Sequence, residues 1–150
     1  MKTAERPSHE IWDERFAQRS DPPYCLYDVD RKKGIATITF NKPEKLNAAT
    51  PGDLQELTEK TIEAEEDHDV KIIVYKGAGS CFSSGVDLEW VSHAFGVKGE
   101  RRLSQRYRYL RVQPLLSRKG LHQTVLYCLK ATIAHVLGYC YGTAFTLATA

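Results

Sequence analysis

Two short segments of the chain place small residues and glycine directly before a stretch with helical periodicity. Ser83-Ser84-Gly85-Val86 precedes one such stretch, and Gly142-Thr143-Ala144 precedes another. Glycine and other small residues let a ligand approach backbone N–H groups closely. Two amides aimed at one carbonyl oxygen stabilise the negative charge that develops when the carbonyl is attacked or its α-carbon loses a proton. A structural interpretation competes, because each turn alone is typical of an ordinary strand-to-helix connection.

Side chains that could move a proton lie near these turns but have ordinary roles available to them. The candidates are Asp87, Glu89, His93, Tyr107 and His135. Asp87 is expected to cap the helix after the first turn, and Glu89 is typical of a solvated first-turn carboxylate. His93 is expected to be exposed or hydrogen-bonded, Tyr107 to pack, and His135 to be a core or interface histidine. None of them is assigned as the acid or base.

Cysteine and histidine spacing does not indicate a metal site or a disulfide framework. The four cysteines are widely spaced without a Cys-x-x-Cys pair, and none of the five histidines pairs with another at ligand spacing. We therefore expect no bound metal, and free thiols in a reducing cytoplasm.

The composition is that of one soluble globular domain. The chain has 150 residues, of which 42% are hydrophobic and 27% are charged. Its 21 basic and 19 acidic residues nearly balance, so neither nucleic acid nor an anionic membrane is expected as a partner. No apolar run could span a bilayer, and the first residues do not look like a secretory signal. A cytoplasmic protein is therefore expected.

The apolar periodicity predicts an alternation of strands and helices, which is an α/β fold. Residues 1–23 are expected to form an extension outside a domain at 24–150. The predicted strands are 24–30, 34–40, 70–75 and 133–136. The predicted helices are 51–67, a mostly helical stretch from 87 to about 130 broken at Pro114 and Lys119-Gly120, and 143–150.

The helix predicted at 51–67 has a clear N-terminal signal. Thr50 is suited to the N-cap position, and Asp53 lies in the first turn. The apolar stripe that contains Leu57 and Ile62 is expected to face the core, and Glu56 is expected largely on the opposite face.

Three segments in order resemble the crotonase superfamily of enoyl-CoA hydratases and isomerases. They are Ile38 to Ala48, with its Asn-Lys-Pro and Leu-Asn-Ala sequences; Cys81 to Leu88, with Phe-Ser-Ser-Gly-Val-Asp-Leu; and Lys130 to Gly142, which ends in a glycine-containing turn. The resemblance covers about residues 24–150 and implies the N-terminal part of the family's spiral of strand-strand-helix units. It implies that the spiral is incomplete at the C-terminus, so we expect a fragment of a longer chain.

The resemblance also implies a site for an acyl-coenzyme A thioester, with coenzyme A as part of the substrate and no permanently bound cofactor. The amides of Val86 and Thr143 would be the two oxyanion donors. Contacts to the substrate would come from two loops and a turn: Lys45, Leu46, Ala48, Ser83, Ser84, Gly85, Asp87, Leu88 and Gly142. The family further implies homotrimers or dimers of trimers.

Two basic features of the chain remain open. Lys45 either meets a coenzyme A phosphate as a point charge or is a solvated loop lysine. The arginines from Arg101 to Arg111 either attract the phosphates or an acidic acyl chain, pair with a neighbouring subunit, or form a solvated helix face, which we favour.

The chain also departs from the family pattern. Counting from Gly142 puts Thr146 where hydratases carry their first glutamate, and Thr143 and Ala144 stand where glycines are usual. Threonine cannot act as a general base near neutral pH. The leading hypothesis is a hydratase, isomerase or lyase acting through a thioester enolate. The alternatives are a catalytically silent acyl-CoA-binding or assembly subunit of the same fold, and an unrelated α/β domain.

Overall fold

A computed structural model of the chain describes residues 19–95 and 120–150. Most of the predicted extension, the basic stretch from Arg101 to Arg111, Tyr107 and the break at Pro114 lie outside these residues. The side chain of His93 lies outside them as well.

One sheet of four strands organises the described residues in the order β1-β2-β3-β4. Strands β1 (Cys25–Asp30) and β2 (Ile35–Phe40) form an antiparallel hairpin, whose turn contains Gly34 with φ +69°. Strands β3 (Ile72–Gly77) and β4 (Ala131–His135) add in parallel, so the carboxyl ends of β2, β3 and β4 meet at one edge. The fold is therefore mixed α/β, as the sequence predicted.

The predicted third and fourth strands exist but were placed about two residues away from their true bounds. Val70 was assigned to a strand because it is apolar, yet it lies before β3 and is 3% exposed in the core. Hydrophobic runs record burial, whereas strand bounds are set by pairing, and β3 begins at Ile72 because Ile72 pairs with Ile35.

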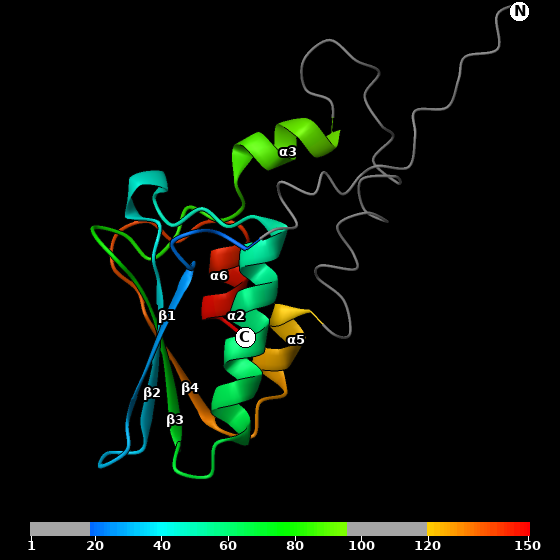
Figure 1. The fold of residues 1–150 in the computed structure, drawn as a ribbon. Helices are drawn as coiled ribbons and strands as arrows, with labels where there is room; N and C mark the ends of the chain where they lie inside the picture. The colour runs from blue at the N-terminus through cyan, green and yellow to red at the C-terminus, as the bar shows by residue number, and fades with distance from the viewer. Residues whose placement is uncertain (1–18, 96–119) are drawn as a thin grey trace, which may run out of the picture.

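Helices α2 (Pro51–Glu66), α5 (Leu121–Leu126) and α6 (Thr143–Ala148) stack on one side of the sheet, and α3 (Leu88–Phe95) projects beyond its upper end (Figure 1). A short 3-10 helix, η1 (Pro43–Lys45), follows β2. The prediction that helix continues to about residue 130 was wrong beyond Leu126. Lys130 instead donates its ammonium to the carbonyls of Ala64 and Asp67, which ties the connection into β4 to the last turn of α2.

The core lies between the sheet and α2. Ala36, Ile38 and Phe40 are at most 1% exposed on β2, and Ile73 and Tyr75 are equally buried on β3. Among the residues of the chain that the structure describes, no helix is long and apolar enough to cross a membrane.

The predicted faces of α2 were partly wrong. Ile62 is 39% exposed, whereas Glu56 is only 4% exposed. The two carboxylate oxygens of Glu56 accept from the amides of Tyr24 and Cys25, each at 3.2 Å. Glu56 therefore satisfies the amides at the start of β1, a role that its charge alone did not predict. Thr50 caps α2 as predicted, and Asp53 completes a capping box with it.

Candidate functional site

Three loops that are far apart in the sequence run side by side beyond the carboxyl ends of β2, β3 and β4. Ala49 and Val86 form a parallel bridge, and Ser83 and Cys140 form a second one. The amide of Ser84 also donates to the carbonyl of Leu46 at 2.9 Å, and the amide of Phe82 to that of Leu137 at 2.6 Å. These bonds fix the loop at 46–49, the turn at 83–87 and the turn at 139–142 against one another.

The bridge to Ala49 sets the direction of the Val86 amide. Ala49 donates its N–H to the carbonyl of Gly85 at 2.8 Å and accepts the N–H of Asp87 at 2.9 Å. Because alternate peptide groups of an extended chain point to opposite sides, the amide of Val86 points away from Ala49. Within residues 19–95 and 120–150, the Val86 amide has no backbone acceptor. It is a backbone donor held in a defined direction.

The second turn presents a donor at the start of α6. Gly142 has φ +55° and ψ −123°, a conformation that essentially only glycine adopts. The bonds of the turn are made by its neighbours: Ala144 donates to the carbonyl of Tyr141, and Thr146 donates to that of Gly142. In the described part of the chain the amide of Thr143 also has no backbone acceptor.

The two turns contact each other at Gly85. A Cβ built on Gly85, whose φ is +94°, would lie 2.7 Å from the carbonyl oxygen of Tyr141 and 3.7 Å from the Cα of Gly142. Any side chain at this position would therefore separate the turns. The structure brings the predicted residues Ser83, Gly85 and Gly142 together in this way.

Asn47 holds the first loop to the second, and sequence reasoning treated it only as part of a motif. It is fully buried with φ +54°. Its Nδ2 donates to the carbonyls of Ala78, Cys81 and Phe82 at 2.9–3.2 Å, and its Oδ1 accepts the amide of Lys42 at 3.0 Å. Asparagine tolerates the left-handed conformation, and its side chain bonds to nearby backbone groups. This property of the residue type was the sequence signal that could have indicated the structural role of Asn47.

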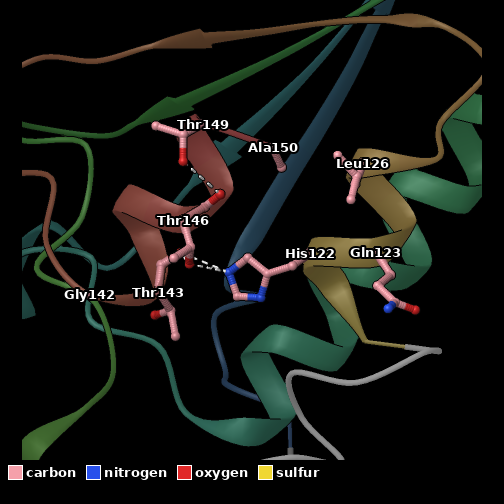
Figure 2. A pocket seen from close by; sticks show the side chains of 8 residues that line it. All are labelled: His122, Gln123, Leu126, Gly142, Thr143, Thr146, Thr149 and Ala150. Atoms are coloured by element: carbon pink, nitrogen blue, oxygen red, sulfur yellow. Dashed lines mark hydrogen bonds between the residues drawn. The ribbon is translucent and has the colours of Figure 1, made fainter.

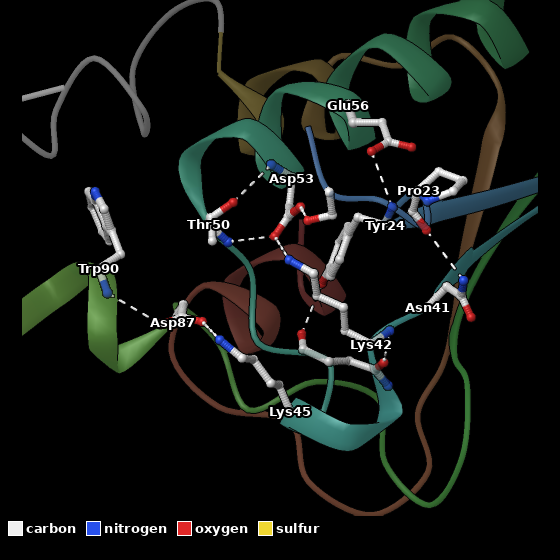
Figure 3. A network of polar contacts seen from close by, with 12 residues as sticks. Pro23, Tyr24, Asn41, Lys42, Lys45, Thr50, Asp53, Glu56, Asp87 and Trp90 are labelled. Atoms are coloured by element: carbon white, nitrogen blue, oxygen red, sulfur yellow. Dashed lines mark hydrogen bonds and ion pairs between the residues drawn. The ribbon is translucent and has the colours of Figure 1, made fainter. Parts of the chain in front are cut away.

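A buried polar network supports the same loop (Figure 3). The Lys42 ammonium lies 2.6 Å from Oδ2 of Asp53, whose side chain is fully buried, and the hydroxyl of Ser20 donates to Oδ1 at 2.6 Å. The Tyr24 hydroxyl donates to the carbonyl of Asn47 at 2.9 Å. Burial raises the pKa of Tyr24 well above its ordinary value, so the phenol stays a neutral donor.

Asp87 is a helix cap, as predicted, and its carboxylate is fully engaged. One oxygen accepts the amides of Glu89 and Trp90, and the other lies 3.2 Å from the Lys45 ammonium. Burial by itself raises the pKa of Asp87, but the amide of Trp90, the ammonium of Lys45 and the amide of Glu89 together hold it below its ordinary value. Asp87 is therefore ionised at neutral pH and poorly suited to accept a proton.

The predicted loop contacts differ in accessibility. Lys45 is half exposed and lies 3.7 Å from Glu89 as well, and its hydrogen bond to Asp87 raises its pKa. The side chains of Leu46 and Leu88 are exposed, Ser84 is partly exposed, and Ala48 is 8% exposed. His135 is exposed on β4, so the core position considered for it is wrong.

An open pocket of about 670 Å³ lies between α5 and α6 (Figure 2). Gly142, Thr143 and Thr146 form part of its wall, and His122 reaches it from α5. Nε2 of His122 lies 2.5 Å from Oγ1 of Thr146 and 3.1 Å from the carbonyl oxygen of Thr143. The other predicted site residues do not line this pocket. Sequence reasoning missed His122, because it precedes Thr143 by 21 residues without a motif.

Comparison with known proteins gives a consistent result. The family model for enoyl-CoA hydratase/isomerase matches residues 30–150. A "probable enoyl-CoA hydratase echA14" of Mycobacterium tuberculosis is 34% identical over 125 residues, covering 83% of this chain and 43% of that protein. A 4-chlorobenzoyl coenzyme A dehalogenase-2 of Arthrobacter is 44% identical over 63 residues, or 42% of this chain and 23% of that protein.

Solved structures agree with the sequence comparisons. An enoyl-CoA hydratase/isomerase from Xanthobacter autotrophicus Py2 has a TM-score of 0.63 and 34% identity, covering 87% of this chain and 43% of that one. The chain spans less than half the length of the curated relatives that it matches. The loops, the turns and the matched range together identify the chain as a member of the enoyl-CoA hydratase/isomerase (crotonase) family.

Proposed function

We propose that the complete protein is an acyl-CoA enzyme that polarises a thioester carbonyl with the backbone amides of Val86 and Thr143. One observation carries the proposal: two donors without a backbone acceptor, among the described residues, sit on turns that touch at Gly85. Donors that are fixed before the substrate arrives stabilise a developing oxyanion without reorganisation. The names of the relatives, which include a hydratase and a dehalogenase, favour a thioester of coenzyme A as the substrate.

The coenzyme A moiety is proposed to lie along the loop at 45–48 and the turn at 83–88. Lys45 is half exposed there and carries a positive charge next to Asp87. Exchanging a protein carboxylate for a phosphate would keep the ammonium paired, so this lysine can serve as a point charge for a phosphate. The exposed Leu46 and Leu88 offer apolar surface on either side.

Thr146 limits which reaction is proposed. The hydroxyl that stands at the proposed position of the first glutamate cannot take a proton at neutral pH. Hydration by two glutamates is therefore not proposed, and the reaction belongs to the wider group that proceeds through an enolate or oxyanion. The same residue supports the alternative of a silent acyl-CoA-binding subunit.

The test measures how strongly the protein polarises the thioester carbonyl. Crotonyl-CoA labelled with carbon-13 at the thioester carbonyl is bound to the complete protein, and the carbonyl stretch is followed by isotope-edited infrared spectroscopy. Polarisation by two amides lowers the stretching frequency relative to the free thioester. Coenzyme A without an acyl group, which lacks the band, serves as the blank. An unshifted band in a saturated complex, or absence of binding, would overturn the proposal.

We also propose that the complete protein is a homo-oligomer, a trimer or a dimer of trimers. The supporting observation is apolar surface along β4 and its flanking loops, where Leu129 is 93% exposed and Leu137 is 58% exposed. Apolar surface of this kind is typical of a face that another surface covers. Light scattering on the complete protein tests this, and a monodisperse monomer would contradict it.

A further inference from the structure

The pocket between α5 and α6 contains a histidine that the proposed oxyanion site does not yet use. His122 is partly buried and shares the pocket wall with Thr143, the proposed second donor. Of the eight residues that line the pocket, His122 alone carries a side chain of a type that serves as a general base. Gly142 and Thr143 of the second donor turn therefore share a pocket with this imidazole.

The hydrogen bonds of Thr146 orient the imidazole. Oγ1 of Thr146 lies 2.9 Å from the carbonyl of Thr143, to which it donates, and 2.5 Å from Nε2 of His122. A hydroxyl has one hydrogen, so donation to Thr143 leaves Oγ1 as the acceptor of an Nε2–H. In that tautomer Nδ1 carries the lone pair, and in Figure 2 the second ring nitrogen points away from Thr146. This is the arrangement of a base whose tautomer is fixed by a third group.

We infer that His122 is the proton acceptor of this site and that Thr146 is its positioning residue. The inference rests on the proposed function. In the step, the C–H bond at the α-carbon breaks and its electron pair enters the enolate, whose oxygen is held by the two amides. A new N–H bond forms on Nδ1, which leaves an imidazolium. The proton returns to carbon from the same nitrogen, so no other reactant is needed.

This assignment explains why a threonine is suited to position 146. A carboxylate at position 146 would lie within reach of the imidazole and would pair with it. A threonine instead accepts a hydrogen bond and places no negative charge beside the imidazole, and only a neutral imidazole can take a proton. The absence of a glutamate at this position is then compatible with an enzyme, and the silent subunit is disfavoured.

The experiment uses acetoacetyl-CoA, whose enolate absorbs in the near ultraviolet while the keto form does not. With the complete parent protein, enolate formation in a stopped-flow instrument should be fast, and its rate should rise with pH through one inflection. In His122→Gln the rate should fall about 100-fold or more, and the inflection should disappear. In Thr146→Val the inflection should remain, and the rate should fall only about fivefold.

His68→Gln is the matched control. His68 is exposed in the turn after α2, at the end of the sheet opposite the loops, and its replacement should leave both the rate and the inflection unchanged. Nitrogen-15 spectra of the parent with labelled histidine provide a second readout that needs no variant. Binding of acetoacetyl-CoA should convert the His122 ring to imidazolium.

The outcomes separate the two proposals. If His122→Gln binds the probe and forms enolate at the parent's rate, or if the parent's His122 stays neutral in a complex that contains enolate, the inference is wrong and the proposed function stands. If the parent fails to bind the probe, or binds it without forming enolate, the inference fails in both cases, and the first result also removes the proposed function.

Discussion

Asp87 donates its amide to the carbonyl oxygen of Ala49 at 2.9 Å, and this bond turns the preceding amide, that of Val86, away from the first loop. Proline at position 86 deletes that N–H while leaving the flanking bonds to Ala49 available. We expect Val86→Pro to cost about 2.7–4 kcal/mol of transition-state stabilisation, the range for one lost oxyanion donor. The measurement is kcat/KM of the complete protein on its thioester substrate.

Val86→Ala is the control for this prediction, because it shortens the side chain but keeps the donor. Its loss of kcat/KM should be small compared with that of Val86→Pro. Circular dichroism must first show that the proline variant folds, since proline also restricts Gly85 before it. Equal activity in a folded Val86→Pro variant would mean that this turn is only a structural connection.

Gly142→Ala should lower the stability of the fold and weaken the polarisation of the bound thioester carbonyl. A Cβ on Gly142 would meet nothing within 4 Å among the described residues, so the cost arises from the backbone at φ +55° and ψ −123°. We expect a loss of about 1–3 kcal/mol in urea unfolding, together with a weaker infrared shift of the bound carbonyl.

Gly34→Ala provides the comparison. Gly34 also has positive φ (+69°), but it lies in the β1–β2 turn, away from the loops. It should lose about 1 kcal/mol of stability and leave the carbonyl shift intact. An identical infrared response in the two variants would argue against a role for the Gly142 turn in binding.

Asn47→Ala should be among the more damaging single changes outside the donor turns. It leaves the Lys42 amide and three carbonyls, two of them in buried contacts, without their side-chain partner, which we expect to cost about 3 kcal/mol in the free energy of unfolding. Asn41→Ala is the matched control, because its Nδ2 makes only a 3.3 Å exposed bond to Pro23. It should change stability by less than about 0.5 kcal/mol, and a similar loss in both variants would contradict the role of Asn47.

Asp87→Asn should make the free energy of unfolding less dependent on pH than it is in the parent. The folded-state pKa of Asp87 lies below its ordinary value, so its charge stabilises the fold above about pH 3.9 and this contribution is lost as pH falls through the folded pKa. Urea unfolding should show the parent more stable by about 1 kcal/mol at pH 7, with the difference shrinking at acid pH. Glu89→Gln, at an exposed carboxylate, should differ little from the parent in its free energy of unfolding at either pH. A pH-independent gap between parent and Asp87→Asn would rule out the charge as its cause.

The sequence predicted best what depends on neighbours in the chain. The cap of Thr50 on α2 and that of Asp87 on α3 use partners two or three residues away, so their residue types are informative. The burial of Glu56 depends on amides 31 and 32 residues distant, and the contact of His122 with Thr146 spans 24 residues. Such side chains carry no local signal, since they acquire their roles only when the sheet and helices are assembled. The helix end at Leu126 was missed for the same reason.

A pair of donors made from main chain has an evolutionary consequence. If Val86 and Thr143 are the donors as proposed, selection there acts on the path of the backbone and excludes proline, but it leaves the side chains free to vary. The residues proposed to accept the proton and to position its acceptor, His122 and Thr146, lie on separate helices. Descendants of one ancestor can therefore exchange their acid-base groups by single substitutions while they keep the means of activating a thioester. Under the proposed roles, a threonine at position 146 changes the chemistry available to the site and leaves its scaffold intact.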